Sequence, residues 1–186
     1  MADLRLVVGL GNPGARYKCT RHNVGFRLIE LLASEDCRWK DFSGLGRTAR
    51  QGDLILAQPL TYMNESGRCV CALKNFYKIA PEEMLICFDD VALPLGRLRL
   101  RASGSSGGQK GMQSIIDGLG TLEIPRLRIG VGPQPPGWDS TDFVLNRFSA
   151  QEEKKIHDVL DEAAAAVKTV QTGGLEAAMN RFNSAP

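Results

Sequence analysis

Residues 4–14 read LRLVVGLGNPG, an apolar run that passes directly into a glycine-rich turn. A short apolar run bounded by turn residues predicts a buried β-strand, here over Leu4–Val8. Two further runs of the same character, Leu54–Ala57 and Met84–Phe88, predict two more buried strands. These three runs predict at least three strands at the centre of one sheet.

Helical patterns lie between and after these strands. Apolar residues recur at helical spacing over 24–32, 70–77 and 156–170, and a short last helix is expected after Gly173–Gly174. The apolar faces of the first two helices are expected to comprise Val24, Leu28, Ile29, Leu31 and Leu32, then Val70, Leu73, Phe76 and Tyr77.

The second half of the chain adds strands with a basic face. Leu98 and Leu100 alternate with arginines, and residues 126–131 alternate in a similar way, so both segments predict half-buried strands. The alternation of strands and helices predicts an α/β fold, in which a twisted mixed β-sheet is flanked by helices on both faces. We expect a single domain over residues 1–186 that includes the C-terminal helices of residues 150–183.

Composition and charge disfavour several classes of protein. Of the 186 residues, 43% are hydrophobic and 24% charged, which is a globular composition, and no run of about 18 apolar residues predicts a spanning helix. The first strand pattern begins too early to leave room for a secretory signal. Five irregularly spaced cysteines and two histidines argue against a disulfide framework and a zinc site. We therefore expect a protein of a reducing compartment without a metal, and its net charge of +2 is compatible with a nucleic-acid partner.

The turn at residues 9–14, GLGNPG, matches the GxGxxG pattern of dinucleotide-binding proteins. A pyrophosphate would have to meet a helix N-terminus directly after the glycines, but here the helical pattern begins only near Asn23 and Pro13 interrupts the turn. A nucleotide cofactor is therefore disfavoured. A tight turn that needs glycine dihedrals explains the three glycines, although it leaves Asn12 unexplained.

Several polar residues are candidates for chemistry because of where they stand relative to the strands. Asn12 follows the first strand, Asn64 follows the second across a short loop, and Asp89-Asp90 closes the third. If these strands are parallel, the three positions gather at one sheet edge, where α/β proteins place their sites. His22 is the natural general base near neutral pH, and an adjacent Asp would hold its tautomer. The alternatives are a cap or surface histidine and simple strand termination at the Asp pair.

Residues 103–111, SGSSGGQKG, form a glycine-serine segment before an expected helix over 112–119. One interpretation is a flexible connector. The other is a mobile wall whose backbone amides and Lys110 meet a phosphate.

Taken in order, these segments resemble the bacterial-type peptidyl-tRNA hydrolase family. The matching stretches are GLGNPGARYKCTRHNVG, PLTYMNESG, FDDVALPLG, GSSGGQKGM, RLRIGVG and FVLNRF. The resemblance implies a cytoplasmic, monomeric esterase that needs no metal or cofactor. Such an enzyme binds the 3′ end and acceptor stem of peptidyl-tRNA and hydrolyses the ester between the peptide and the 3′ ribose, releasing tRNA and peptide.

The resemblance also implies roles for individual residues. His22 would activate water, Asp89 would orient and stabilise His22, and Asn12 would distinguish N-blocked peptidyl-tRNA from free aminoacyl-tRNA. The positions that match substrate or tRNA contacts are Tyr17, Tyr62, Met63, Asn64, Gln109, Lys110, Arg99, Arg101 and Arg128. Without the resemblance, a solvated strand face would be the simpler interpretation of the arginines.

Departures from the family pattern bear on activity. Gln109-Lys110 stands where the family usually has His-Asn, and Ala92 stands where it often has an Asp before Leu-Pro. The first change removes an amide that contacts substrate or orders water in relatives, while Lys110 adds a charge that attracts phosphate but accepts no hydrogen bond. Because the His22 and Asp89 pair remains, we expect the activity to be retained. The alternative is a non-catalytic RNA-binding protein on the same scaffold, as in plastid intron-splicing factors that resemble this family.

Overall fold

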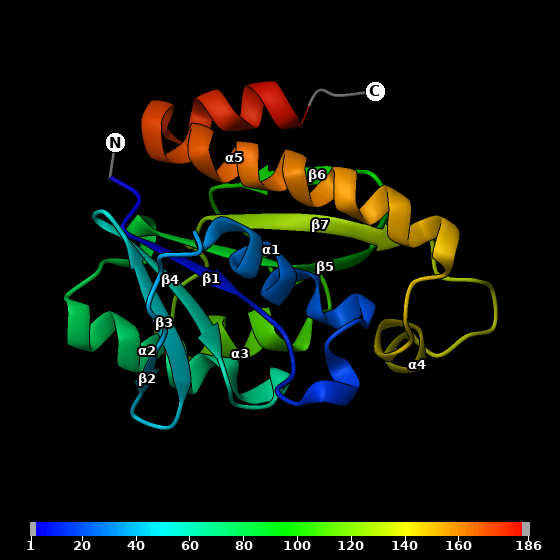
Figure 1. Cartoon of the computed structure of the whole chain (residues 1–186), viewed down its shortest axis with the longest axis horizontal. Helices are drawn as coiled ribbons and strands as arrows, with labels where there is room; N and C mark the ends of the chain where they lie inside the picture. The colour runs from blue at the N-terminus through cyan, green and yellow to red at the C-terminus, as the bar shows by residue number, and fades with distance from the viewer. Residues whose placement is uncertain (1–2, 184–186) are drawn as a thin grey trace.

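The computed structural model describes residues 3–183, which form one seven-stranded mixed sheet with helices on both faces (Figure 1). The strands are β1 (Leu6–Gly9), β2 (Lys40–Phe42), β3 (Gly46–Gln51), β4 (Leu54–Pro59), β5 (Met84–Pro94), β6 (Leu98–Arg101) and β7 (Arg126–Gly132). The α-helices are α1 (Val24–Leu32), α2 (Ser66–Tyr77), α3 (Lys110–Leu119), α4 (Ser140–Leu145) and α5 (Ala150–Phe182). The predicted α/β fold with a mixed sheet between helical layers is confirmed.

The strand order is β2-β3-β4-β1-β5-β7-β6. β1 is parallel to β4 and β5, and β5 is parallel to β7, so the carboxyl ends of the four central strands lie at one edge of the sheet. The outer strands β2, β3 and β6 are antiparallel to their neighbours. The sequence does not predict the three-residue β2, because two of its residues are exposed and form no apolar run.

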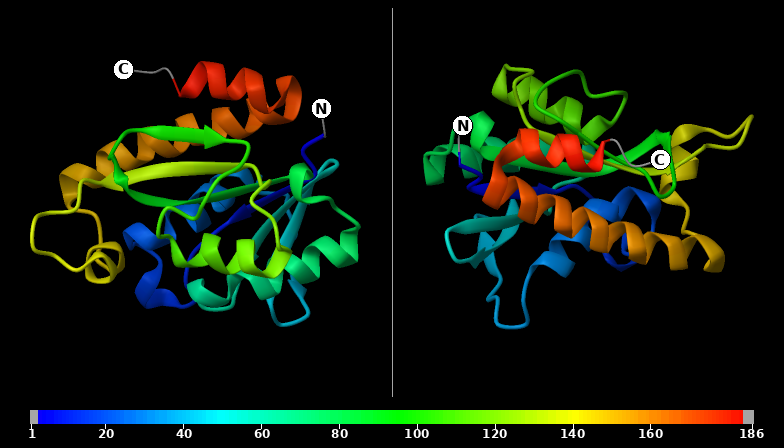
Figure 2. Two further views of the ribbon diagram at one scale, coloured as in Figure 1. Left: turned by 180° about the vertical axis from the view of Figure 1, so that it is seen from behind. Right: turned by 90° about the horizontal axis from the view of Figure 1, so that it is seen from above.

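Alternate residues of the central strands point to opposite faces and meet different helices. Leu6 and Val8 of β1 pack in a core with α2 and α3, whereas Val7 packs in a second core with α1 and α5. Figure 2 shows α5 on one side of the sheet and α2 with α3 on the other. Burial on both faces explains why β1, β4 and the first half of β5 are continuous apolar runs rather than alternating ones.

Two residues assigned to apolar helix faces are exposed instead. Leu31 of α1 is 48% exposed, because it lies in a surface hollow with Glu30 and Leu160 at the edge of the contact between α1 and α5. Phe76 of α2 is 68% exposed; its ring meets the ring of Phe42, in the short edge strand β2, edge-on at 5.5 Å. Helical spacing identifies the apolar face of each helix, but it does not show how much of that face neighbouring elements cover.

The glycines after β1 are needed mainly for close packing, which corrects the expectation that their dihedrals explain all three. A Cβ at Gly9 would lie 2.1 Å from the carbonyl oxygen of Gly25, and one at Gly11 would lie 2.7 Å from the Phe26 ring. Only Gly14 has a positive φ, 106°. The missing side chains let α1 pack directly on the turn, which brings the segment before α1 close to the sheet edge.

β5 does not end at Asp89-Asp90, contrary to the sequence interpretation. It continues to Pro94, and Asp89 and Asp90 pair with Ile129 and Gly130 of β7 before a register shift. The two carboxylates therefore project from within a paired strand. This gives them a more rigid base than a loop would.

The C-terminal segment covers the sheet on the face that α1 also covers. The backbone of Gly174 is non-helical (φ 85°, ψ 165°) and divides α5 into two helical segments, which confirms the short last helix predicted after Gly173–Gly174. Beyond its end, the Asn183 side chain accepts from the backbone N–H of Leu100 at 2.7 Å and donates to its carbonyl at 3.0 Å. These bonds satisfy backbone groups on the free edge of β6. Among the described helices, none combines the length and apolar character that crossing a membrane requires.

Candidate active site

His22 and Asp89 meet beside the carboxyl ends of the central strands. His22 lies in the 3₁₀ turn Arg21–Asn23 before α1, and its Nδ1 is 2.8 Å from Oδ2 of Asp89. Both are buried, with 9% of His22 and 3% of Asp89 exposed. Because an ionised carboxylate only accepts, Nδ1 carries the ring proton and donates it to Asp89. The structure thus brings the predicted pair together and leaves the Nε2 lone pair of His22 available as a base.

Asn12 is held in place from two sides. Its Oδ1 accepts from the backbone N–H of Met63 at 2.8 Å. The Asn23 side chain accepts from the backbone N–H of Asn12 and donates to its carbonyl, both at 2.9 Å. Because Oδ1 must be the acceptor, Nδ2 of Asn12 remains as a donor. The buried Asn12 is thereby tied to the residue that follows His22, a link that the sequence analysis missed.

Gln109 completes the surroundings of Asp89. Its Nε2 donates to Oδ1 of Asp89 at 3.0 Å and also lies 3.2 Å from the sulfur of Met63. Its Oε1 accepts from the backbone N–H of Met112 at 2.8 Å, which makes Gln109 the N-cap of α3. Both ends of this buried amide are engaged by the protein, whereas the resemblance implies a substrate contact.

A cavity of about 180 Å³ opens beside the pair. Its walls come from the turn before α1, from β5, from the glycine-serine segment and from α4. The lining residues are His22, Phe88, Asp89, Asp90, Val91, Ser106, Gly107, Gly108, Gln109, Lys110, Ser140, Thr141 and Val144. The glycine-serine segment therefore forms part of the cavity wall, which fits the interpretation as a wall better than the interpretation as a flexible connector.

The sequence analysis missed the contribution of α4 to this cavity. Asp139 caps α4 by accepting from the backbone N–H groups of Thr141 and Asp142, and these bonds lower the pKa of the Asp139 carboxyl. A β-bridge between Thr20 and Arg147 fastens the segment after α4 beside the turn that carries His22. No local pattern could have signalled this, because the contact joins residues far apart in the chain.

The implied substrate contacts Tyr17, Tyr62, Met63 and Asn64 are not among the residues that line the cavity. Tyr62 is 55% exposed and Asn64 is also exposed, both in the turn after β4. Tyr17 is half-buried, and the Arg16 guanidinium lies 4.5 Å from its ring centroid. Met63 is buried beneath Gln109 and is a packing partner rather than an exposed contact.

The arginines at the β6–β7 edge differ from one another. Arg99 is half-exposed and Arg101 is exposed on β6. Arg128 of β7, opposite Arg99, has its Nε 2.6 Å from Oδ2 of Asp90, an ion pair without the alignment of a good hydrogen bond. Arg128 is therefore already partly neutralised by a residue of the cavity wall.

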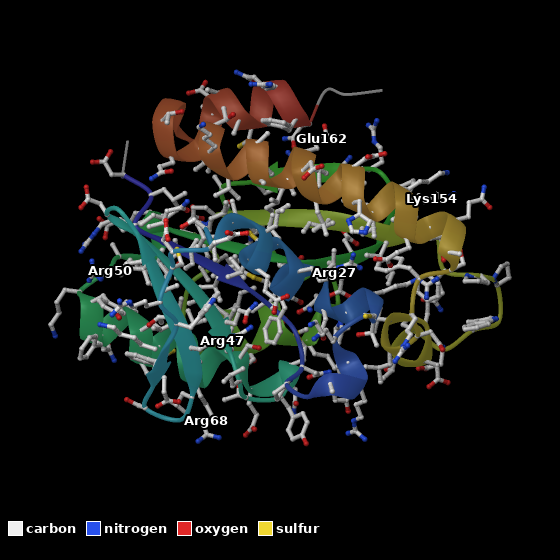
Figure 3. All side chains as sticks on the ribbon, in the orientation of Figure 1. Arg27, Arg47, Arg50, Arg68, Lys154 and Glu162 are labelled. Atoms are coloured by element: carbon white, nitrogen blue, oxygen red, sulfur yellow. The ribbon has the colours of Figure 1, made fainter. Side chains whose placement is uncertain are left out.

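Arginines are not confined to this edge. Figure 3 shows Arg47, Arg50 and Arg68 around β3 and α2. None of the three lines the cavity. The positive charge is therefore spread over the surface, in keeping with a small net charge.

Arg126 is buried, which the alternating pattern of β7 did not predict. Only 2% of it is exposed, and its guanidinium donates at 2.6 to 3.0 Å to carbonyl oxygens on both sides. The acceptors are Gly104, Ser105, Leu122 and Ile124. Burial and the neighbouring Arg128 charge lower the pKa of this guanidinium. Arg126 thus ties the glycine-serine wall to the segment before β7.

Arg21 fastens the turn that carries His22. Its Nη2 donates to both carboxylate oxygens of Glu152 in α5 at 3.0 and 2.9 Å, and its Nη1 donates to the carbonyl of Arg147 at 2.8 Å. Partial burial alone would raise the pKa of Glu152. Hydrogen bonds from the Ser149 backbone and from Arg21 outweigh that effect, so the pKa is lowered.

Within residues 3–183, no three His, Cys, Asp or Glu side chains lie together in a way that could hold a metal ion. The five cysteines are free thiols. Burial raises the pKa of the Cys69 thiol to about 12 and also raises that of Cys87. These two cysteines pack in the cores on opposite faces of the sheet.

Comparisons with known proteins agree with one another. The family model described as Peptidyl-tRNA hydrolase matches residues 6–186. The chain is 48% identical to a peptidyl-tRNA hydrolase of Elusimicrobium minutum over 185 residues, which cover 97% of this chain and 99% of that protein. It is 47% identical to that of Symbiobacterium thermophilum, over 97% and 99% of the two chains. A crystal structure of peptidyl-tRNA hydrolase from Acinetobacter baumannii superposes with a TM-score of 0.91 at 36% identity, over 99% of this chain and 96% of that one.

Proposed function

Since the chain belongs to the peptidyl-tRNA hydrolase family, we propose that His22 and Asp89 activate the water with which it hydrolyses peptidyl-tRNA and releases the tRNA. The observation that carries this proposal is the 2.8 Å contact between Nδ1 of His22 and Oδ2 of Asp89 at the wall of the cavity. It holds the tautomer in which Nε2 is the base.

The reaction uses His22 first as a base and then as an acid. Nε2 takes a proton from water while the water oxygen bonds to the ester carbonyl carbon. The tetrahedral intermediate collapses when the bond to the 3′ ribose oxygen breaks, and the imidazolium returns its proton to that oxygen. The products are the peptide carboxylic acid, which ionises, and tRNA with a free 3′ hydroxyl. Asp89 keeps the ring oriented and stabilises the imidazolium in between.

Asn12 is the proposed discriminator between blocked and free substrates. Its Oδ1 is occupied by the Met63 N–H, so the amide presents Nδ2 as a hydrogen-bond donor. An N-blocked aminoacyl ester carries an acyl carbonyl that can accept such a bond, whereas a free amino group is a cation and cannot. A buried donor that stays unpaired disfavours the unblocked substrate.

The tRNA is proposed to lie across the exposed residues around the cavity. Arg99, Arg101 and Lys110 supply positive charge toward the acceptor stem, and Arg128 can exchange its ion pair with Asp90 for a phosphate. Tyr17, Tyr62 and Asn64 offer aromatic rings and an amide to the 3′ end. We propose that the enzyme acts as a cytoplasmic monomer without a metal or other cofactor.

The test is hydrolysis of an N-acetylated aminoacyl-tRNA beside its unblocked counterpart, with and without a metal chelator. We expect cleavage of the blocked ester alone, at the same rate with chelator. Asn12→Asp keeps the acceptor for Met63 but removes the Nδ2 donor, so kcat/KM for the blocked ester should fall about tenfold. Loss of activity with chelator would contradict the metal-independent mechanism. An undiminished preference in Asn12→Asp would remove Asn12 as the discriminator.

A further inference from the structure

We propose that Gln109 is a positioning residue that acts on the reaction through Asp89, rather than a contact for substrate. This inference rests on the proposed role of His22 and Asp89. Gln109 stands at a position where the family pattern usually has histidine.

The orientation of the Gln109 amide is determined by its surroundings. Oxygen and nitrogen of a side-chain amide are assigned from their partners. The backbone N–H of Met112 can only donate, so the atom 2.8 Å from it must be Oε1. The other end is therefore Nε2, and it donates to Oδ1 of Asp89 at 3.0 Å.

The amide is also held rigidly. Gln109 is the N-cap of the ten-residue α3, and it packs against Met63 and Gly111. A Cβ at Gly111 would lie only 2.4 Å from the Met63 sulfur and 3.1 Å from Oε1 of Gln109. Gln109 is 8% exposed and Asp89 is 3% exposed, so little water competes for the bond between them.

The consequence for Asp89 is that each carboxylate oxygen has its own donor. Oδ2 faces Nδ1 of His22 at 2.8 Å, and Oδ1 faces Nε2 of Gln109 at 3.0 Å. Two donors on opposite oxygens fix the plane of the carboxylate and thereby the direction in which His22 is held. The neutral amide also disperses part of the carboxylate charge without adding a charge of its own.

This arrangement sets how strongly His22 holds its second proton. If Oδ1 lost its donor, more of the negative charge would act on the ring, and the imidazolium would be stabilised relative to the neutral base. His22 would then be neutral, and able to act as a base, only at higher pH. Gln109 thus limits the negative charge that Asp89 presents to the His22 ring.

A substrate contact explains the geometry less well. To bind substrate with its amide, Gln109 would have to give up the helix cap or the Asp89 bond, since both ends are occupied. Lys110, the next residue, is exposed and lines the cavity, and its ammonium group makes no hydrogen bond or ion pair with residues 3–183. Substrate contact at this part of the cavity wall is therefore better assigned to Lys110 than to Gln109.

The test compares Gln109→Met with Gln109→Glu. Gln109→Met is neutral and offers Asp89 no donor in any protonation state. Gln109→Glu preserves shape and keeps an acceptor for Met112, but it turns an oxygen in place of the donor toward Asp89 only at a pH where the two carboxyl groups no longer share a proton. We expect kcat at neutral pH to fall about 10- to 100-fold, the weight of one hydrogen bond to a charged group. KM for N-acetylated aminoacyl-tRNA should stay within about twofold, because substrate binding is not the function removed. The acidic limb of the kcat/KM profile should move to higher pH.

A second readout does not depend on activity. The chain has only two histidines, so the ring signals of His22 can be followed by NMR and assigned with His157→Gln, a residue whose side chain is 70% exposed. The midpoint of the His22 titration should rise by roughly half a pH unit or more in Gln109→Met, which lacks the donor. If that variant does not fold, Gln109→Glu should raise the midpoint in the same direction once both carboxyl groups are ionised.

Gln113→Glu is the matched control. It makes the same change of charge on the same helix, one turn further along, at an exposed residue that does not contact Asp89. We expect kcat and the His22 titration to stay within error of the parent enzyme. An effect equal to that of Gln109→Glu would reduce the proposal to long-range charge.

The outcomes separate this proposal from the one on which it rests. A raised KM with unchanged kcat and an unchanged His22 titration in Gln109→Met would make Gln109 a substrate contact and overturn the positioning role. A lower melting temperature with no change in pH profile would make it purely a helix cap, which also overturns it. Retained activity in a folded His22→Ala enzyme would instead overturn the proposed base, whatever Gln109 does.

Discussion

The buried polar residues at and beside the cavity are held differently from the exposed residues of the candidate site. His22, Asp89, Asn12 and Gln109 are each at most 9% exposed, and their side chains are joined to one another or to the backbone by hydrogen bonds. The surrounding residues, of which Tyr62 at 55% exposure is typical, face solvent. Buried, mutually bonded groups are ordered before substrate arrives, which suits proton transfer. Exposed groups can adjust to a large RNA, which suits binding.

The largest effect on catalysis is expected at His22, the proposed general base. His22→Ala should lower kcat about 10²- to 10⁴-fold, the usual contribution of a general base, while KM changes little. Single-turnover hydrolysis of N-acetylated aminoacyl-tRNA measures this directly. His157→Ala replaces the other, exposed histidine of the chain and should leave kcat unchanged. Near-normal turnover in folded His22→Ala would contradict the role of His22 as the base.

The next largest effect concerns the wall of the cavity. Arg126→Met removes the donor from four carbonyl groups, so the free energy of unfolding should fall by about 2–3 kcal/mol. Denaturant unfolding measures the loss. Arg101→Met removes the same charge from the exposed residue that pairs with Arg126 across the strands, and it should cost less than about 0.5 kcal/mol. Equal losses in the two variants would mean that Arg126 is not an anchor.

A smaller effect is expected at the ion pair between Glu152 of α5 and Arg21, which precedes His22. Glu152→Gln should lower the free energy of unfolding by about 1 kcal/mol at pH 7, since the pair is partly exposed. The folded-state pKa of Glu152 lies below its ordinary value of 4.5, so this contribution is complete above that pH and is lost as the pH falls through the lowered pKa. Unfolding curves of both proteins should therefore converge in acid.

The control for that pH dependence is Glu176→Gln, an exposed glutamate on the same helix. Its unfolding curve should stay parallel to that of the parent protein at every pH. A Glu152→Gln difference that persisted undiminished in acid would show that packing, not charge, fastens Arg21 to α5.

The smallest effects belong to the exposed arginines. Arg99→Ala and Arg101→Ala should each weaken tRNA binding slightly and reduce the log–log salt slope by about 0.7–0.9, the value for one lost phosphate contact. Arg128→Ala should reduce it by less, because Asp90 already neutralises part of that charge. Binding titrations at several salt concentrations test the order. Unchanged slopes in the first two variants would place the tRNA elsewhere on the surface.

Much of the fold could be predicted because the strands are marked by local pattern. The runs that contain β1, β4 and β5 are apolar on both faces, and turn residues bound them. Where an element ends is less well marked. β5 continues through Asp89 because pairing with β7 outweighs the change to polar residues, and Leu31 is exposed because the helix that would cover it lies slightly aside.

The candidate site could be predicted in part. His22 and Asp89 were singled out because few side chains can serve as a base, and because parallel strands bring their carboxyl ends to one edge. The role of Gln109 and the burial of Arg126 were not foreseen. Both depend on which backbone groups lie beside them, and their acceptors or donors sit on segments that local pattern does not bring together.

The sequence by itself determined the fold class and the family and singled out His22 and Asp89 as candidates, since residue type and spacing are local features of the chain. Only the tertiary structure decided which of the implied residues are buried and bonded and which face solvent. Burial depends on what packs above a residue, and hydrogen bonds depend on direction as well as on residue type. For that reason Gln109 and Lys110, which are adjacent in the chain and both line the cavity, differ in their surroundings: Gln109 is buried and bonded to Asp89, whereas Lys110 is exposed.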